Sequence, residues 1–372
     1  MYIYIYKMVV IALLGLFTVC MAVNTIDRCP ELESDIPPPK NVHDLHPSHI
    51  KVTGCIGDSI TAGVAAKNID SPYVTFDDFK EYRGLSWLCG IDPDATSISN
   101  YIKRYSPGII GGSTGVRQLR LCKDTFFCMD YGHDYKLDQH NAAVPSGTSN
   151  TIIDQVNYLS KYMGADSPHA DDWKIVNLYL GTNDISVSCN PTYGGINYKR
   201  NIQKGLELLK KNVNKVIVNV VGLAHTEQIP GLTDKKQPGY RKRFENSKLD
   251  PQRFECLCCR VPIFGKMDIS MHVDRFNRIL QRVAKDYGPG GTLGSDTFTV
   301  VYQPFNLDVS SLPVEAISNL DGYHPNTVAY RFFSMALWSQ MFLSKAEKTS
   351  TLTYTEDTEI FCPIASSRIR TD

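Results

Sequence analysis

The sequence has no excess of charge of either sign, because 39 lysines and arginines are balanced by 39 aspartates and glutamates among its 372 residues. This balance provides no polybasic surface, so we expect no nucleic-acid partner. Beyond residues 1–22 the sequence also lacks any apolar run long enough to span a membrane. It contains no Asn-x-Ser/Thr sequon with a permitted middle residue, so N-glycosylation is not expected.

Residues 1–22 have the pattern of a secretory signal peptide, with Lys7 before a short apolar stretch and the small residue Ala22 at a plausible cleavage point. A membrane anchor is the alternative interpretation, although the stretch is short for a span. The chain after Lys345 is polar, which argues against a lipid-anchored C-terminus. We therefore expect a secreted protein that is soluble once its signal is removed.

Eleven cysteines occur, of which Cys20 lies within the signal segment. The even number that remains indicates disulfides in an oxidising compartment. Spacing does not define their pairing, although Cys122 and Cys128 are close enough to close a small loop. The Cys-Leu-Cys-Cys stretch at 256–259 could instead bind a metal, but no histidine or further cysteine pair lies at zinc-finger spacing, so we favour disulfides.

Apolar periodicity predicts one large α/β domain between two short terminal segments. Strands are predicted at 50–56, 175–180, 216–221 and 298–303, and helices at 151–163, 197–212, 270–287 and 327–343. Because strands alternate with helices, residues 50–345 are expected to form a three-layer α/β/α domain of the flavodoxin-like kind, with a central and mostly parallel sheet. Residues 346–372 are expected to form a polar C-terminal tail.

The segment 23–49 is expected to be an extended N-terminal arm, since it contains three consecutive prolines. His43, His46 and His49 have a spacing that could bind metal on a helix. Pro47 lies inside this string and disfavours a regular helix, so we do not assign a metal site there.

Three short motifs carry the chemistry. Gly-Asp-Ser-Ile-Thr-Ala-Gly at 57–63 follows an apolar strand and places Ser59 at a turn, where α/β folds locate their reactive groups. Gly-Thr-Asn-Asp at 181–184 follows a second apolar run. Asp-Gly-Tyr-His-Pro-Asn at 321–326 puts Asp321 and His324 three residues apart, on one side of a turn. A serine, an imidazole and a carboxylate within hydrogen-bond reach form an activated nucleophile.

In this order the motifs resemble the GDSL, or SGNH, hydrolase family, and most closely its animal phospholipase B-like branch; the resemblance covers roughly residues 50–345. It implies the SGNH hydrolase fold and a serine esterase that cleaves acyl esters of phospholipids and lysophospholipids. The implied triad is Ser59, Asp321 and His324, and the mechanism requires no metal or other cofactor.

The resemblance also implies an oxyanion hole made by the backbone N–H groups of Ser59 and Gly147 and the side-chain amide of Asn183. Gly147 is the best match to the family's glycine, but a proline two residues earlier means that the register could slip by one residue. Asp58 and Asp184 are expected to brace the neighbouring turns through hydrogen bonds to the backbone.

Two alternatives remain open. A short-chain or carbohydrate O-acetyl esterase would use the same chemistry on a different acyl ester, and a secreted lipid-binding protein could keep the fold without turnover. The presence of every proposed catalytic side chain argues against the second. The expected partner is a lipid or another small acyl ester. Transient contact with a membrane surface is compatible with such a substrate. The sequence does not define the oligomeric state.

Overall fold

The computed structural model of the chain describes residues 23–32, 36–119, 132–246, 250–260, 269–349 and 351–372. The expected signal segment and the Cys122 and Cys128 pair lie outside these residues. Within the described ranges, no helix combines the length and the apolar character needed to cross a membrane.

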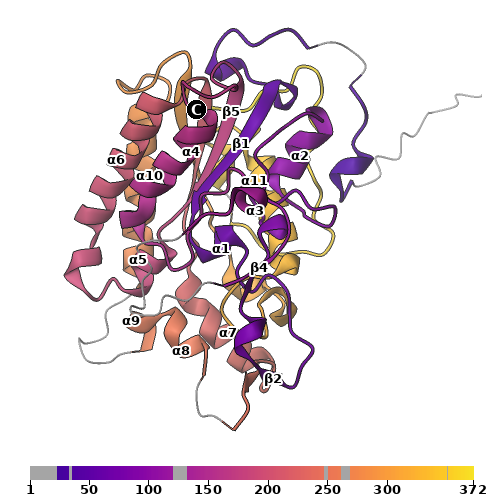
Figure 1. The fold of residues 1–372 in the computed structure, drawn as a ribbon, viewed down its shortest axis with the longest axis vertical. Coiled ribbons are helices and arrows are strands. Elements are labelled where there is room, and N and C mark those ends of the chain that lie inside the picture. Colours follow the sequence, from indigo (N-terminus) through magenta and orange to yellow (C-terminus); the bar gives the residue numbers. More distant parts are fainter. Residues whose placement is uncertain (1–22, 33–35, 120–131, 247–249, 261–268, 350) are drawn as a thin grey trace, which may run out of the picture.

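A four-stranded parallel sheet forms the centre of the fold (Figure 1). Its strands, in spatial order, are β1 (Ile50–Gly57), β5 (Trp173–Tyr179), β6 (Val216–Val221) and β8 (Phe298–Gln303). All four predicted strands are confirmed. Their residues are buried almost throughout, because a parallel sheet covered on both faces needs continuous apolar strands rather than alternating ones.

Helices cover both faces of this sheet, which confirms the three-layer α/β/α architecture (Figure 1). One layer consists of α4 (Ile152–Met163), α6 (Gly195–Asn212) and α10 (Ile269–Tyr287), and the other contains α2 (Ile98–Tyr105) and α11 (Thr327–Gln340). The helices predicted from periodicity are α4, α6, α10 and α11, and their observed ends differ from the predicted ones by three residues or fewer.

Shorter elements surround the carboxyl end of the sheet. The short helices are α1 (Ser59–Ala62), α3 (Tyr135–Asp138), α5 (Thr182–Ser186), α7 (Ile229–Lys236), α8 (Gln252–Glu255) and α9 (Leu257–Arg260). Two small ribbons pair β2 (Tyr73–Val74) with β7 (Arg243–Phe244), and β3 (Lys80–Glu81) with β4 (Arg117–Gln118).

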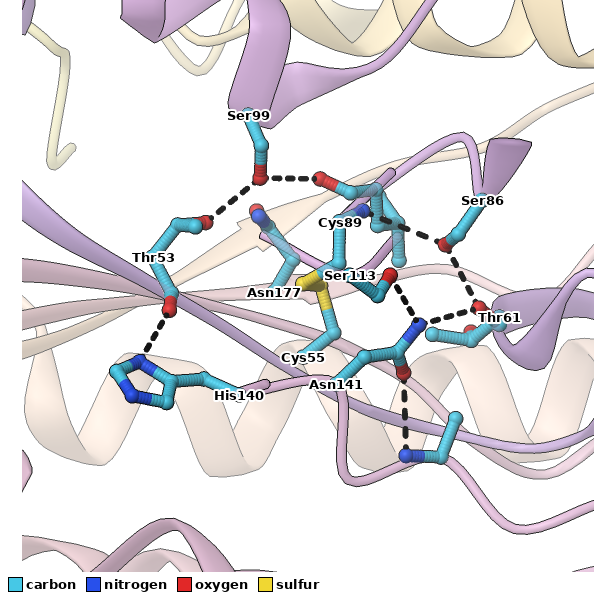
Figure 2. The surroundings of a disulfide bond; sticks show 12 residues. Thr53, Cys55, Thr61, Ser86, Cys89, Ser99, Ser113, His140, Asn141 and Asn177 are labelled. Atoms are coloured by element: carbon cyan, nitrogen blue, oxygen red, sulfur yellow. Dashed lines mark hydrogen bonds between the residues drawn. A yellow bond between two sulfur atoms is a disulfide. The ribbon is translucent and has the colours of Figure 1, made fainter. Parts of the chain in front are cut away.

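A disulfide between Cys55 of β1 and Cys89 connects the first strand to the long segment that follows α1 (Figure 2). Beside it, the Asn141 amide donates hydrogen bonds to the Thr61 carbonyl (3.2 Å) and the Ser113 hydroxyl (3.2 Å). Asn141 also forms a parallel bridge with Cys55, so its segment lies along the free edge of β1. The network therefore holds α1 and the residues near 141 in fixed positions at the sheet edge.

The two terminal segments pack against each other. Cys29 forms a disulfide with Cys362, and the Ile369 N–H donates to the Leu45 carbonyl at 2.8 Å. Leu45 and Ile369 are buried in the main hydrophobic core. The expected arm and tail thus contribute to the core, even though the tail is polar in overall composition. His43 and His46 hydrogen-bond to nearby hydroxyl groups rather than to one another.

The Cys29–Cys362 disulfide should contribute measurably to stability, because it joins residues 333 positions apart and restricts the unfolded chain. We expect Cys362→Ser to lower the free energy of unfolding by about 2–5 kcal/mol in urea titrations. Ser366→Ala, at an exposed position in the same segment, serves as the control and should change it little. An unchanged stability in Cys362→Ser would show that the terminal segments are held without the bridge.

Candidate active site

The turn that follows β1 presents Ser59 at the carboxyl end of the sheet. Asp58 caps α1, and its Oδ1 accepts a hydrogen bond from the Ile60 N–H at 3.1 Å. Gly57 is required before this turn, because a Cβ there would collide with the Thr61 side chain and the Tyr179 carbonyl. The chain turns directly after β1, and Ser59 is half-buried at the carboxyl end of the sheet.

The structure brings Ser59, His324 and Asp321 into one hydrogen-bonded chain. His324 Nε2 lies 2.8 Å from Ser59 Oγ, and His324 Nδ1 lies 2.7 Å from Asp321 Oδ2. Asp321 Oδ1 also accepts the backbone N–H groups of Tyr323 (2.8 Å) and His324 (3.0 Å). Because a carboxylate only accepts, Nδ1 carries the proton of the neutral ring, and in that state Nε2 is left to accept from the serine hydroxyl.

Burial and charge act in opposite directions on the two titratable members of this chain. Burial alone would raise the pKa of Asp321, but the charge and hydrogen bonds of His324 hold this pKa below its ordinary value. Burial alone would lower the pKa of His324, but the negative charges of Asp321 and Glu255 raise it above its ordinary value. The imidazole consequently keeps a proton to higher pH than a free histidine does.

Glu255, at the end of α8, was not found by sequence reasoning. Its Oε2 lies 3.9 Å from His324 Nδ1, and its side chain is 25% exposed. Burial and the neighbouring charge of Asp321 raise the pKa of the Glu255 carboxyl. No sequence signal marks this residue, because it belongs to the Cys-rich segment, which carries no motif of the family.

Glu255, Asp321 and His324 are also the only described residues that group three side chains of metal-binding types within 4.8 Å. Both ring nitrogens of His324 already face hydrogen-bond partners, Asp321 on one side and Ser59 on the other.

Asn183 and Asp184 join the second motif to the loop near residue 147. The Asn183 side-chain amide donates to the Gly147 carbonyl at 3.0 Å. Asp184 accepts from both the N–H (2.7 Å) and the hydroxyl (2.6 Å) of Ser149. Burial raises the pKa of Asp184 to about 7 and that of Asp58 to about 6. Both aspartates thus accept hydrogen bonds from the backbone of turns.

The Gly147 N–H does not have the role expected from sequence in this conformation. It donates to the Val144 carbonyl at 2.8 Å, which closes a tight turn. The preceding Ser146 has a φ of 60°, in the left-handed region that a serine rarely adopts. Within the part of the chain that the structure describes, the Ser146 N–H has no hydrogen-bond acceptor. The turn therefore leaves the amide of Ser146, rather than that of Gly147, without a partner.

Two buried polar side chains that no sequence pattern marks support these loops. Gln155 of α4 accepts the Gly57 N–H (2.8 Å) and donates to the Gly57 carbonyl (2.9 Å), which fixes the residue before the turn. Arg83 is fully buried, pairs with Glu81 and donates to the Ala143 carbonyl at 2.8 Å. These bonds hold the backbone of Gly57 and of Ala143 in place.

Comparisons with known proteins identify the family of the chain. A family model described as GDSL-like Lipase/Acylhydrolase matches residues 54–337, a range that contains all three motifs. The curated protein "Phospholipase B1, membrane-associated" of Mus musculus is 29% identical over 357 residues, which are 91% of this chain and 22% of that protein.

Proteins of the same name from Homo sapiens (28% identical, 90% of this chain, 22% of that protein) and Rattus norvegicus (27%, 93% and 23%) are also similar. The chain spans less than a quarter of the length of these relatives. Since the family model covers most of the chain, including all three motifs, the protein belongs to the GDSL-like lipase/acylhydrolase family.

Proposed function

We propose that this protein hydrolyses acyl ester bonds of phospholipids and lysophospholipids through a triad of Ser59, His324 and Asp321. The observation that carries the proposal is the hydrogen-bonded chain from Ser59 Oγ through His324 to Asp321. The lipid class is supported by the similarity to proteins named phospholipase B1. The three disulfides between described cysteines support secretion, because such bonds persist in oxidising compartments.

In the first half-reaction, Ser59 Oγ attacks the acyl carbonyl carbon while His324 Nε2 takes the hydroxyl proton. The resulting imidazolium donates through Nδ1 to Asp321, whose charge stabilises it. When the ester C–O bond breaks, Nε2 returns the proton to the leaving alcohol oxygen, and the acyl group remains on Ser59. Water then attacks the acyl-serine with His324 again as the base, which releases the carboxylic acid.

The oxyanion of each tetrahedral intermediate needs donors that are already in position. The Ser59 N–H at the start of α1 is one. Asn183 supplies a second, because its amide has two protons and only one of them is used on the Gly147 carbonyl. For the third we infer the Ser146 N–H, since Gly147 could serve only after its bond to Val144 opens. The strained φ of Ser146 supports this inference, because such strain concentrates at functional sites.

Replacing the nucleophile tests the proposal directly. We expect Ser59→Ala to reduce kcat by roughly 10⁶-fold, because nucleophile and base act as one unit. The circular dichroism spectrum should be unchanged, since the fold is retained. Ser71→Ala, at an exposed serine, is the control. The assay should use phosphatidylcholine, lysophosphatidylcholine and short p-nitrophenyl esters. Retained turnover in folded Ser59→Ala would contradict the triad, whereas wild-type activity confined to acetyl esters would contradict only the lipid class.

The role of Asn183 predicts a separation between rate and affinity. Loss of one oxyanion donor costs about 10²- to 10³-fold in kcat, so Asn183→Ala should fall in that range while KM changes little. Asn214→Ala is a matched control, because this exposed asparagine precedes β6 at the opposite end of the sheet. A change in KM alone would place Asn183 in contact with the bound substrate rather than the oxyanion.

The pH profile should rise with pH, since His324 must be neutral to accept the Ser59 proton. Because the pKa of His324 is raised, activity should be lost as pH falls through a value above the ordinary histidine range of about 6.5. We expect kcat/KM to increase through this inflection, to stay high in mild alkali, and to be unaffected by EDTA. A maximum near pH 4, or loss of activity to EDTA, would contradict the serine mechanism.

A further inference from the structure

We propose that Glu255 is a positioning residue for His324, a second carboxylate that shares with Asp321 the charge of the imidazolium formed during acyl transfer. The inference rests on the proposed triad and adds to it a group from a different part of the chain. A serine hydrolase of this kind would then have two carboxylates facing one ring nitrogen.

The geometry around His324 Nδ1 carries this proposal. Asp321 Oδ2 lies 2.7 Å from Nδ1 and receives its hydrogen bond, and Glu255 Oε2 lies 3.9 Å from the same atom. The His324 side chain is only 4% exposed, so solvent screens the second carboxylate weakly. At this separation an ionised carboxylate favours the charged form of the ring by direct attraction.

The surroundings of Glu255 provide an independent argument. Among the described residues, its carboxylate receives no hydrogen bond, and its one ion-pair partner is His324. A carboxylate that is three-quarters buried normally has a donor or a cation beside it. Here that partner exists only when the imidazole is protonated, which is the state that forms in each half-reaction.

Contacts before and after Glu255 in the chain restrict its position. On one side, the Gln252 side chain donates to the Gly322 carbonyl at 2.8 Å, which ties α8 to the loop between Asp321 and His324. On the other side, Cys258 of α9 is disulfide-bonded to Cys189, shortly after α5. The Cys-rich segment thereby holds its glutamate against the loop that carries the imidazole.

The other charged groups near His324 come from several elements. Asp321 lies on its own loop, and Asp58 faces it from the turn after β1. Arg241 packs against Gly322, but it forms an ion pair with Asp250 at 2.6 Å. The field at the ring is therefore negative, and removal of the Glu255 charge should lower the pH at which His324 loses its proton.

The test compares the pH dependence of two reactions of Ser59: labelling by a fluorophosphonate and hydrolysis of a short p-nitrophenyl ester. Glu255→Gln keeps the shape and removes the charge, and it should move the inflection of both profiles to lower pH by about one pH unit. It should also reduce the rate on the alkaline plateau. Glu245→Gln makes the same chemical change at an exposed position of the same segment and should leave both profiles unchanged.

Glu255→Asp serves as the second variant, because it keeps the charge and should retain an inflection above that of Glu255→Gln. An unchanged inflection in Glu255→Gln, or a uniform loss of rate without a shift, would overturn the inference and leave Glu255 with a structural role. Failure of the proposed function is distinguishable, because it would appear as labelling and turnover that persist in Ser59→Ala.

Discussion

Parallel pairing between β1 and β5 is the constraint on which the site depends. Gly57 pairs with Tyr179, so the turns that follow these strands emerge side by side and place Ser59 near Asn183. The third motif reaches the same edge through packing rather than through the sheet. The Tyr330 hydroxyl of α11 donates to the Ile60 carbonyl of α1 at 2.9 Å, which joins the helix after His324 to the helix that begins with Ser59.

The charged groups at this edge of the sheet favour the protonated form of His324. Asp321, Glu255 and Asp58 all act to raise the pKa of His324, so the site is built to hold an imidazolium. The same negative field opposes a developing oxyanion at the substrate. In the proposed mechanism its stabilisation therefore comes from neutral donors, namely backbone N–H groups and the Asn183 amide. The carboxylates of Asp321 and Glu255 both face Nδ1, on the side of the His324 ring away from Ser59. They are therefore on the side where the imidazolium charge, and not the oxyanion, is to be stabilised.

Sequence patterns predicted the strands and the long helices well, because buried parallel strands are continuous apolar runs and helices repeat their apolar positions every three to four residues. Ser59, Asp321 and His324 were recognisable because each lies in a short motif. The Gly147 N–H was expected in the oxyanion hole, but it donates to the Val144 carbonyl. The residue types of a turn do not reveal which of its N–H groups is bonded. Sequence patterns also do not reveal contacts between residues far apart in the chain, such as that between Glu255 and His324.

The disulfides between described cysteines each involve an irregular part of the chain. Cys55–Cys89 lies next to the Asn141 network at α1, Cys189–Cys258 joins the segment after α5 to α9, and Cys29–Cys362 joins the two terminal segments. A loop gains order only at a cost in conformational entropy, and a cross-link reduces that cost by restricting the unfolded chain. Of these three bridges between described cysteines, Cys55–Cys89 restricts the irregular segment beside α1, and Cys189–Cys258 restricts the segment that carries Glu255. Such restriction favours a fixed placement of polar groups before substrate binds.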